Sequence, residues 1–217
     1  MKNRFDEQVE ILNSQMIEMG AMIETTIENA CEALQSGNLE LARSIIDADT
    51  LVDRKERDIE TLCLRMLLTR QPVAHDLRVV SSALKMITDM ERIGDQAADI
   101  SEIVTFLDYS TVVQPEHFGA MARAAIDMVH RAVDAYVRRD VTLARDVIQS
   151  DDTVDELFTD VKRELIELLS ADASRGSEAL DMLMIAKYFE RIGDHATNIA
   201  EWVEYSVTGY YKGEELR

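Results

Sequence analysis

The chain has 217 residues, 47% of them hydrophobic, so it is long enough to fold around a core of its own. It carries 42 acidic and 23 basic side chains, which gives a formal net charge of -19 at pH 7. This charge disfavours direct binding to nucleic acid or to an anionic membrane surface, and it favours cations or basic protein surfaces as partners.

Three helices are expected in the first half of the chain, because only 2 prolines and 8 glycines are present in the whole sequence to break helices. Apolar residues recur at helical spacing from near Phe5 to the Gly37-Asn38 pair, which ends the first helix. A second helix is expected over about residues 39–68. The third begins at Pro72, since the first turn of a helix tolerates the missing N–H of proline, and extends to about Asp108.

A domain boundary is expected between residues 110 and 111. The stretch YSTVVQPE, residues 109–116, is rich in β-branched residues and contains the second proline. Three more helices are expected beyond it, near residues 116–138, 140–170 and 177–208. We therefore divide the chain into two domains, residues 1–110 and 111–217.

The two halves of the sequence repeat each other. Leu41-Ala42-Arg43 recurs as Leu143-Ala144-Arg145, and Glu91-Arg92-Ile93-Gly94-Asp95 recurs as Glu190-Arg191-Ile192-Gly193-Asp194. Such identity at equivalent positions indicates an internal duplication, and each half is long enough to bury a core. The sequence therefore predicts an all-α fold of six helices, arranged as two tandem three-helix bundles.

The third predicted helix has an apolar side and an acidic side, which lie opposite each other on an ideal helix. The apolar stripe comprises Met86, Met90, Ile93, Ala97, Ile100 and Val104. The acidic row comprises Glu91, Asp95, Asp99 and Glu102, and the sixth helix repeats it with Glu190, Asp194, Asn198 and Glu201. We expect both acidic rows to point away from the core of their bundle.

The acidic rows are candidate metal sites. Like charges one turn apart repel by about 0.2 to 0.5 kcal/mol per pair unless a cation neutralises them. Two such carboxylates can bridge a hard or borderline metal ion, and acids of a neighbouring helix can complete its ligands. The candidates on the second helix of each half have the same one-turn spacing: Asp49 and Asp53, with their repeats Asp151 and Asp155. A solvated acidic surface without metal is the alternative.

Other residues on these helices indicate close packing. Gly94 and Gly193 each cost about 1 kcal/mol relative to alanine within a helix, so they mark a close approach. His195 adjoins the second acidic row but has no histidine counterpart in the first. Three apolar residues precede the first row on its own side, so the third helix is covered there by its own bundle, by the other bundle or by a second subunit: Leu77, Val80 and Leu84.

Enzyme motifs are missing from the sequence. A ferritin-like di-iron site needs Glu-x-x-His, and no histidine here has a glutamate three positions before it. His130 could accept a phosphoryl group in a phosphotransfer module, but its counterpart is Glu28. Neither a GxxxxGK[ST] phosphate loop nor a nucleophile elbow is present. We expect no enzyme, and a metal-binding or metal-dependent enzymatic carboxylate bundle is the alternative.

A cytoplasmic location is expected. The N-terminal sequence MKNRFDEQVEIL has acids where a signal peptide needs an apolar core, and no apolar run approaches the roughly 18 residues that span a bilayer. Cys31 and Cys63 lack a C-x-x-C spacing, so we expect two reduced, half-buried thiols.

Three stretches of the chain resemble the PhoU family of phosphate-signalling proteins: ERIGD at residues 91–95, YFERIGDHATNIAEWVEYSVTG at 188–209 and RQPVAHDLR at 70–78. The resemblance implies two three-helix bundles with Glu/Asp-x-x-x-Asp motifs, which hold multinuclear iron or zinc clusters in some members. These motifs fall on Glu91, Asp95 and Asp99 in the first repeat and on Glu190 and Asp194 in the second. Asn198 stands at the counterpart of Asp99, so the second site has one fewer charged ligand.

The same resemblance implies a function and partners. Members of the family act as negative regulators that couple a phosphate ABC transporter to a membrane sensor histidine kinase, so that phosphate-starvation genes stay off when phosphate is plentiful. On this basis we expect the ATPase subunit of the transporter and the kinase as partners, and a homodimer. The protein would reach the inner face of the membrane only through these partners.

Overall fold

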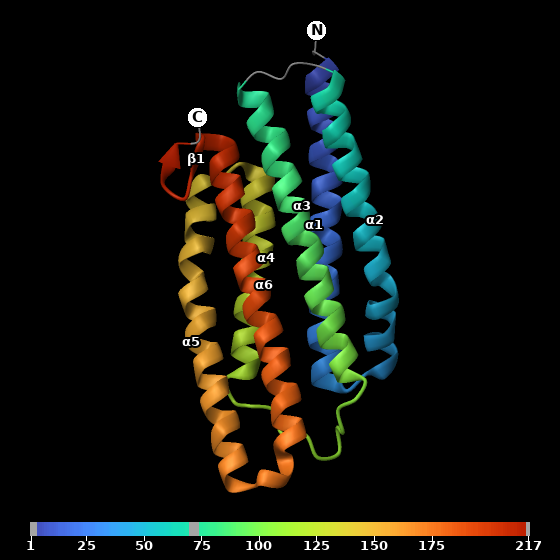
Figure 1. Cartoon of the computed structure of the whole chain (residues 1–217), viewed down its shortest axis with the longest axis vertical. Coiled ribbons are helices and arrows are strands. Elements are labelled where there is room, and N and C mark those ends of the chain that lie inside the picture. Colours follow the sequence, from blue (N-terminus) through green and yellow to red (C-terminus); the bar gives the residue numbers. More distant parts are fainter. Residues whose placement is uncertain (1–3, 70–73, 216–217) are drawn as a thin grey trace.

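The computed structural model describes residues 4–69 and 74–215, and it confirms an all-α fold (Figure 1). The second half also has a short 3₁₀ helix, Ala173–Arg175, and an antiparallel hairpin of strands β1 (Tyr210–Tyr211) and β2 (Glu214–Glu215). The long helices are α1 (Arg4–Ser36), α2 (Leu39–Thr69), α3 (Ala74–Val104), α4 (Phe118–Arg138), α5 (Val141–Ala171) and α6 (Gly176–Thr208).

The second helix of each half begins at an equivalent cap. Asn38 Oδ1 accepts a hydrogen bond from the backbone N–H of Leu41 at 3.1 Å, before the second turn of α2. At the equivalent position before α5, Asp140 Oδ1 accepts from the N–H groups of Thr142 and Leu143, each at 3.0 Å. These side chains satisfy backbone donors that have no partner within the helix, so the repeat extends to local capping.

Four helices form one layer of the molecule and two lie behind it. In Figure 1, α2, α3, α6 and α5 lie side by side from right to left, with α1 behind α3 and α4 behind α6. Helices α3 and α6 run antiparallel and pack directly against each other, and α1 and α4 also contact each other. The two three-helix bundles are therefore joined through both layers.

The core consists of the apolar stripes that the sequence predicts. All six stripe residues of α3 are fully buried, and the equivalent stripe of α6 is at most 1% exposed: Ile185, Phe189, Ile192, Ala196, Ile199 and Val203. Burying a large aliphatic or aromatic side chain contributes about 1.5 to 3 kcal/mol. Both thiols are free and more deeply buried than expected, with Cys31 8% and Cys63 0% exposed.

The predicted end of the third helix is wrong by one turn. Helix α3 ends at Val104 rather than near Asp108. The N–H groups of Thr105 and Phe106 donate to carbonyls only three residues earlier, at 3.0 and 2.9 Å, and this tighter turn ends the helix. The predicted start at Pro72 lies outside the described residues.

The acidic side of α3 is not a free outer surface, because α6 of the other bundle packs against the same helix. Of the apolar residues predicted on that side, Val80 is fully buried and Leu77 is 47% exposed. Of the three covers that the sequence allows for this side of α3, the structure shows the second bundle. The acids of α3 therefore lie beside α6 rather than wholly in solvent.

A glycine allows α1 and α4 to approach each other across the two halves. A Cβ atom at Gly20 would lie 2.7 Å from Cγ1 and 3.3 Å from Cγ2 of Val133. Both residues are buried, so the side chain of Val133 has little open space to move into. The contact between the two rear helices therefore requires glycine at this position.

We expect Gly20→Ala to destabilise the protein by about 1 to 2 kcal/mol, because overpacking against Val133 outweighs the gain in helix propensity. The measurement is the free energy of unfolding in urea. Gly176→Ala is the matched control, since a Cβ atom there would meet nothing within 4 Å. Equal effects of the two substitutions would contradict the close approach.

Candidate metal centre

Three carboxylates of the first half converge between α2 and α3. Oxygens of Asp49, Asp53 and Asp95 lie within 4.8 Å of one another, and all three side chains are half-buried. We call these residues the first acidic cluster. A Cβ atom at Gly94 would lie 3.1 Å from Cγ1 of Val52, so the mid-helix glycine lets α3 approach α2 beside the cluster.

Within the part of the chain that the structure describes, no buried cation offsets the negative charge of the first acidic cluster. Burial raises the pKa of Asp49, and the carboxylates of Asp95, Asp53 and Asp99 raise it further. Burial also raises the pKa of Glu91, again assisted by Asp95. These shifts show that ionising the acids together is unfavourable, so a cation bound among them would be stabilised.

Two arginines reach the first acidic cluster from solvent. Arg92 Nη1 donates to Asp95 Oδ2 at 2.8 Å, and Arg57 Nη2 lies 3.3 Å from Asp53 Oδ2. Their side chains are 54% and 73% exposed. Exposed pairs of this kind contribute about 0 to 1 kcal/mol, so they offset only part of the repulsion.

The donor set of the first acidic cluster suits a hard or borderline divalent cation, because carboxylate oxygen is the preferred ligand of such ions. Asp49 and Asp53 come from one face of α2 and Asp95 comes from the facing turn of α3, and all three are among the larger set of acids that the sequence nominates. Glu91 and Asp99 lie one turn to either side of Asp95 and outside this group of converging oxygens.

The second half has a related but different arrangement, which we call the second acidic cluster: Asp151, Asp155, Glu190 and Asp194. Burial, together with Glu190 and Asp151, raises the pKa of Asp194 to about 6. Burial and Asp155 raise the pKa of Asp151. Lys187 Nζ forms an ion pair with Glu190 Oε1, so a lysine lies at this cluster.

The equivalent positions Asp99 and Asn198 both serve the packing of α3 against α6. Asn198 Nδ2 donates to Asp89 Oδ1 at 3.0 Å, and His195 Nδ1 lies 2.9 Å from the same oxygen. Tyr188, the counterpart of Asp89, lies close enough to Asp99 to offset part of the rise that burial causes in the pKa of that carboxyl. Sequence analysis missed Asp89 and Tyr188, although their exchange between the repeats accompanies the exchange of Asp99 for Asn198.

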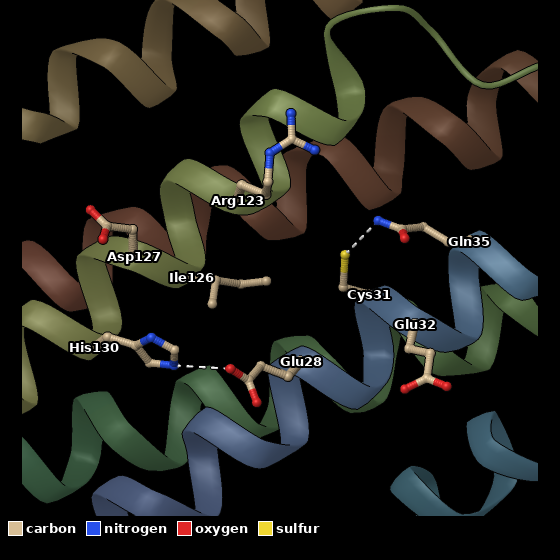
Figure 2. Close-up of a pocket in the computed structure, with 8 residues that line it drawn as sticks. All are labelled: Glu28, Cys31, Glu32, Gln35, Arg123, Ile126, Asp127 and His130. Carbon is tan, nitrogen blue, oxygen red and sulfur yellow. Dashed lines mark hydrogen bonds and ion pairs between the residues drawn. The ribbon is translucent and has the colours of Figure 1, made fainter.

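A separate groove lies between α1 and α4 (Figure 2). His130 Nε2 lies 3.4 Å from Glu28 Oε1 across it, and Gln35 Nε2 donates to Cys31 Sγ at 3.2 Å. Burial raises the pKa of the Cys31 thiol, so this group stays protonated and is a poor nucleophile or metal ligand. Among the described residues, the acids of this groove form no converging group like the first acidic cluster.

The PhoU domain, a protein-family model, matches the chain twice, over residues 16–104 and 118–203. The chain belongs to the PhoU family. It is 34% identical over 209 residues to the phosphate-specific transport system accessory protein PhoU homolog of Clostridium acetobutylicum, with 94% of each chain covered. The homolog of Pseudomonas aeruginosa is 35% identical, with 96% of this chain and 87% of that protein covered.

Two solved structures share the fold. The crystal structure of PhoU from Pseudomonas aeruginosa superimposes with a TM-score of 0.91 at 34% identity, covering 95% of this chain and 100% of that chain. The phosphate transport system regulatory protein PhoU from Streptococcus pneumoniae gives 0.89 at 26% identity, covering 99% and 100%. These relatives are named as accessory and regulatory proteins of phosphate transport, and this chain is a homologue of them. Within residues 4–69 and 74–215, no helix combines the length and apolar character needed to cross a bilayer.

We expect Asp194→Asn to stabilise the metal-free protein by about 1 kcal/mol at pH 7.5, after allowance for solvent screening of a half-exposed carboxyl. The pKa of Asp194 is raised from 3.8 to about 6, so its ionisation destabilises the folded state fully above pH 6 and not below pH 3.8. The gain should therefore shrink at pH 4. The measurement is urea unfolding in EDTA at both values, with Asp146→Asn as the control; a gain independent of pH would contradict the cause.

Proposed function

We propose that this PhoU homologue is a negative regulator of phosphate uptake and of the phosphate-starvation response. It acts as an adaptor between the ATPase subunit of a phosphate ABC transporter and a sensor histidine kinase. The observation that carries this proposal is similarity over nearly the full length to accessory proteins of phosphate-specific transport. The missing catalytic motifs support the same function.

The charge of the chain favours protein partners. A formal charge of -19 suits docking onto basic protein surfaces and disfavours nucleic acid or a bare anionic membrane. The regulator would therefore act from the cytoplasm, at the inner face of the membrane, held there by its partners. A homodimer would present two copies of the four-helix layer to them.

A second candidate function is binding of a divalent cation, supported by the convergence of Asp49, Asp53 and Asp95. Iron or zinc is compatible with these oxygen donors, either as single ions or as multinuclear clusters on the surface. Such an ion would neutralise the acids and tie α2 to α3. The further ligands that the sequence predicts are Glu91, Asp99, Asp155, Glu190 and Asp194.

Deleting the gene from its organism should raise expression of phosphate-starvation genes in high phosphate, because the kinase would lose the signal that phosphate is plentiful. A transcriptional reporter for such a gene measures this, and the wild-type gene on a plasmid should restore repression. Unchanged expression in high phosphate would count against the adaptor function.

Protein purified without a chelator or an affinity tag should contain a divalent metal that is lost in the variant Asp49→Asn/Asp53→Asn/Asp95→Asn. Asparagine keeps the shape of aspartate and removes its charge, so the fold is retained while the oxygen ligands are weakened. Elemental analysis measures the metal content. The control carries Asp47→Asn/Asp58→Asn/Asp146→Asn, three exposed acids outside the cluster, and equal metal in both variants would exclude the first acidic cluster.

A further inference from the structure

One contact beside the two acidic clusters differs in charge between the halves of the chain. In the first half, Thr88 Oγ1 of α3 donates to Glu56 Oε1 of α2 at 3.5 Å. In the second half, Lys187 of α6 and Phe158 of α5 take these places, and Lys187 Nζ lies 5.4 Å from the centre of the Phe158 ring. An ammonium group and an aromatic ring thus replace a hydroxyl and a carboxylate.

Lys187 compensates part of the negative charge of the second acidic cluster, at Glu190. Its ammonium group contacts Oε1 of Glu190, whose side chain is only 13% exposed. The other oxygen, Oε2 of Glu190, is buried and has no hydrogen-bond partner among the described residues, so Lys187 is the cation that the structure places on this carboxylate. The face of Phe158 attracts the same ammonium group from the neighbouring helix and helps to hold it there.

The cations at the first acidic cluster are placed differently. Arg57 and Arg92 are 73% and 54% exposed, compared with 39% for Lys187, so they can turn into solvent when a metal ion approaches. Arg92 also has an identical counterpart, Arg191, and therefore does not distinguish the halves. Arg57 is replaced by Thr159, which leaves Lys187 as the cation specific to the second half.

We propose that Lys187 is an internal counter-cation that lowers the affinity of the second acidic cluster for divalent cations. The chain then binds metal at the first acidic cluster alone, at concentrations that saturate it. This inference rests on the proposed metal binding by Asp49, Asp53 and Asp95. Family resemblance implies a metal site in each half, and with Lys187 in place the residues of the second half do not fit one.

Coulomb repulsion sets the size of the effect. A positive charge within one helical turn of a bound divalent ion repels that ion. Even with the strong screening found near a protein surface, the repulsion lowers the affinity for the ion by about tenfold or more. The same charge stabilises the metal-free cluster. Lys187 should therefore act in opposite directions on metal binding and on the stability of the metal-free protein.

Calorimetric titration of metal-free protein with Mn²⁺ tests the proposal. Wild type should show one class of sites, Lys187→Thr should gain a second class, and Thr88→Lys should weaken binding to the first acidic cluster at least tenfold. Lys162→Thr removes an exposed lysine of α5 and should match wild type. Two classes of similar affinity in wild type, or no second class in Lys187→Thr, would overturn the proposal.

Melting temperature in EDTA at low ionic strength provides a readout that does not depend on metal. Lys187→Thr should lower it by about 2 to 4 °C more than Lys162→Thr, because Glu190 loses its cation, and Lys187→Arg should restore it. Absence of Mn²⁺ binding in every variant would refute metal binding by the first acidic cluster. It would also refute the proposal that the chain binds metal at that cluster alone. Equal melting temperatures for the two threonine variants would refute the counter-cation itself.

Discussion

The antiparallel packing of α3 against α6 is the contact on which the rest of the molecule depends. Each helix buries one apolar stripe in its own bundle, so only its other side is available to join the bundles. That side also carries the acids. Asp89, Asn198 and His195 make polar contacts between α3 and α6, while Asp95 and Asp194 face the outer helices α2 and α5. One helix face thus sets both the assembly of the two halves and the position of the acidic clusters.

Much of this architecture could be predicted from local patterns in the sequence. Apolar spacing on the third helix identified buried residues such as Met86 and Val104, because helical periodicity fixes which residues share a face. The end of α3 could not be predicted in this way, since the turn at Thr105 and Phe106 depends on backbone bonds that leave no sign in composition. Periodicity also does not show which helix covers a given face, so the contact with α6 remained one of three alternatives.

Only part of the candidate site could be predicted from local sequence patterns. One-turn spacing of Asp49 and Asp53 and the repeated motif at Asp95 were sufficient to nominate the acids that converge in space. Lys187 does not follow from the acidic row of either helix, because Phe158 lies on a neighbouring helix and the counterpart of Lys187, Thr88, is uncharged. The two acidic clusters differ at equivalent positions such as Thr88 and Lys187, which lie outside the motif that the two halves share. An internal repeat is therefore informative at the positions where its copies differ.

The exchange of Asp89 for Tyr188 and of Asp99 for Asn198 has a consequence for the origin of the fold. In a symmetric homodimer of single bundles, both contacts across the joint would have to use the same two side chains, and aspartate at both positions would place like charges opposite each other. A single chain has no such restriction, so one contact pairs aspartate with asparagine and the other places tyrosine beside aspartate. The two pairings differ, so each half of the chain is complementary to the other half rather than to a second copy of itself. Subunits of an obligate heterodimer are complementary in the same way.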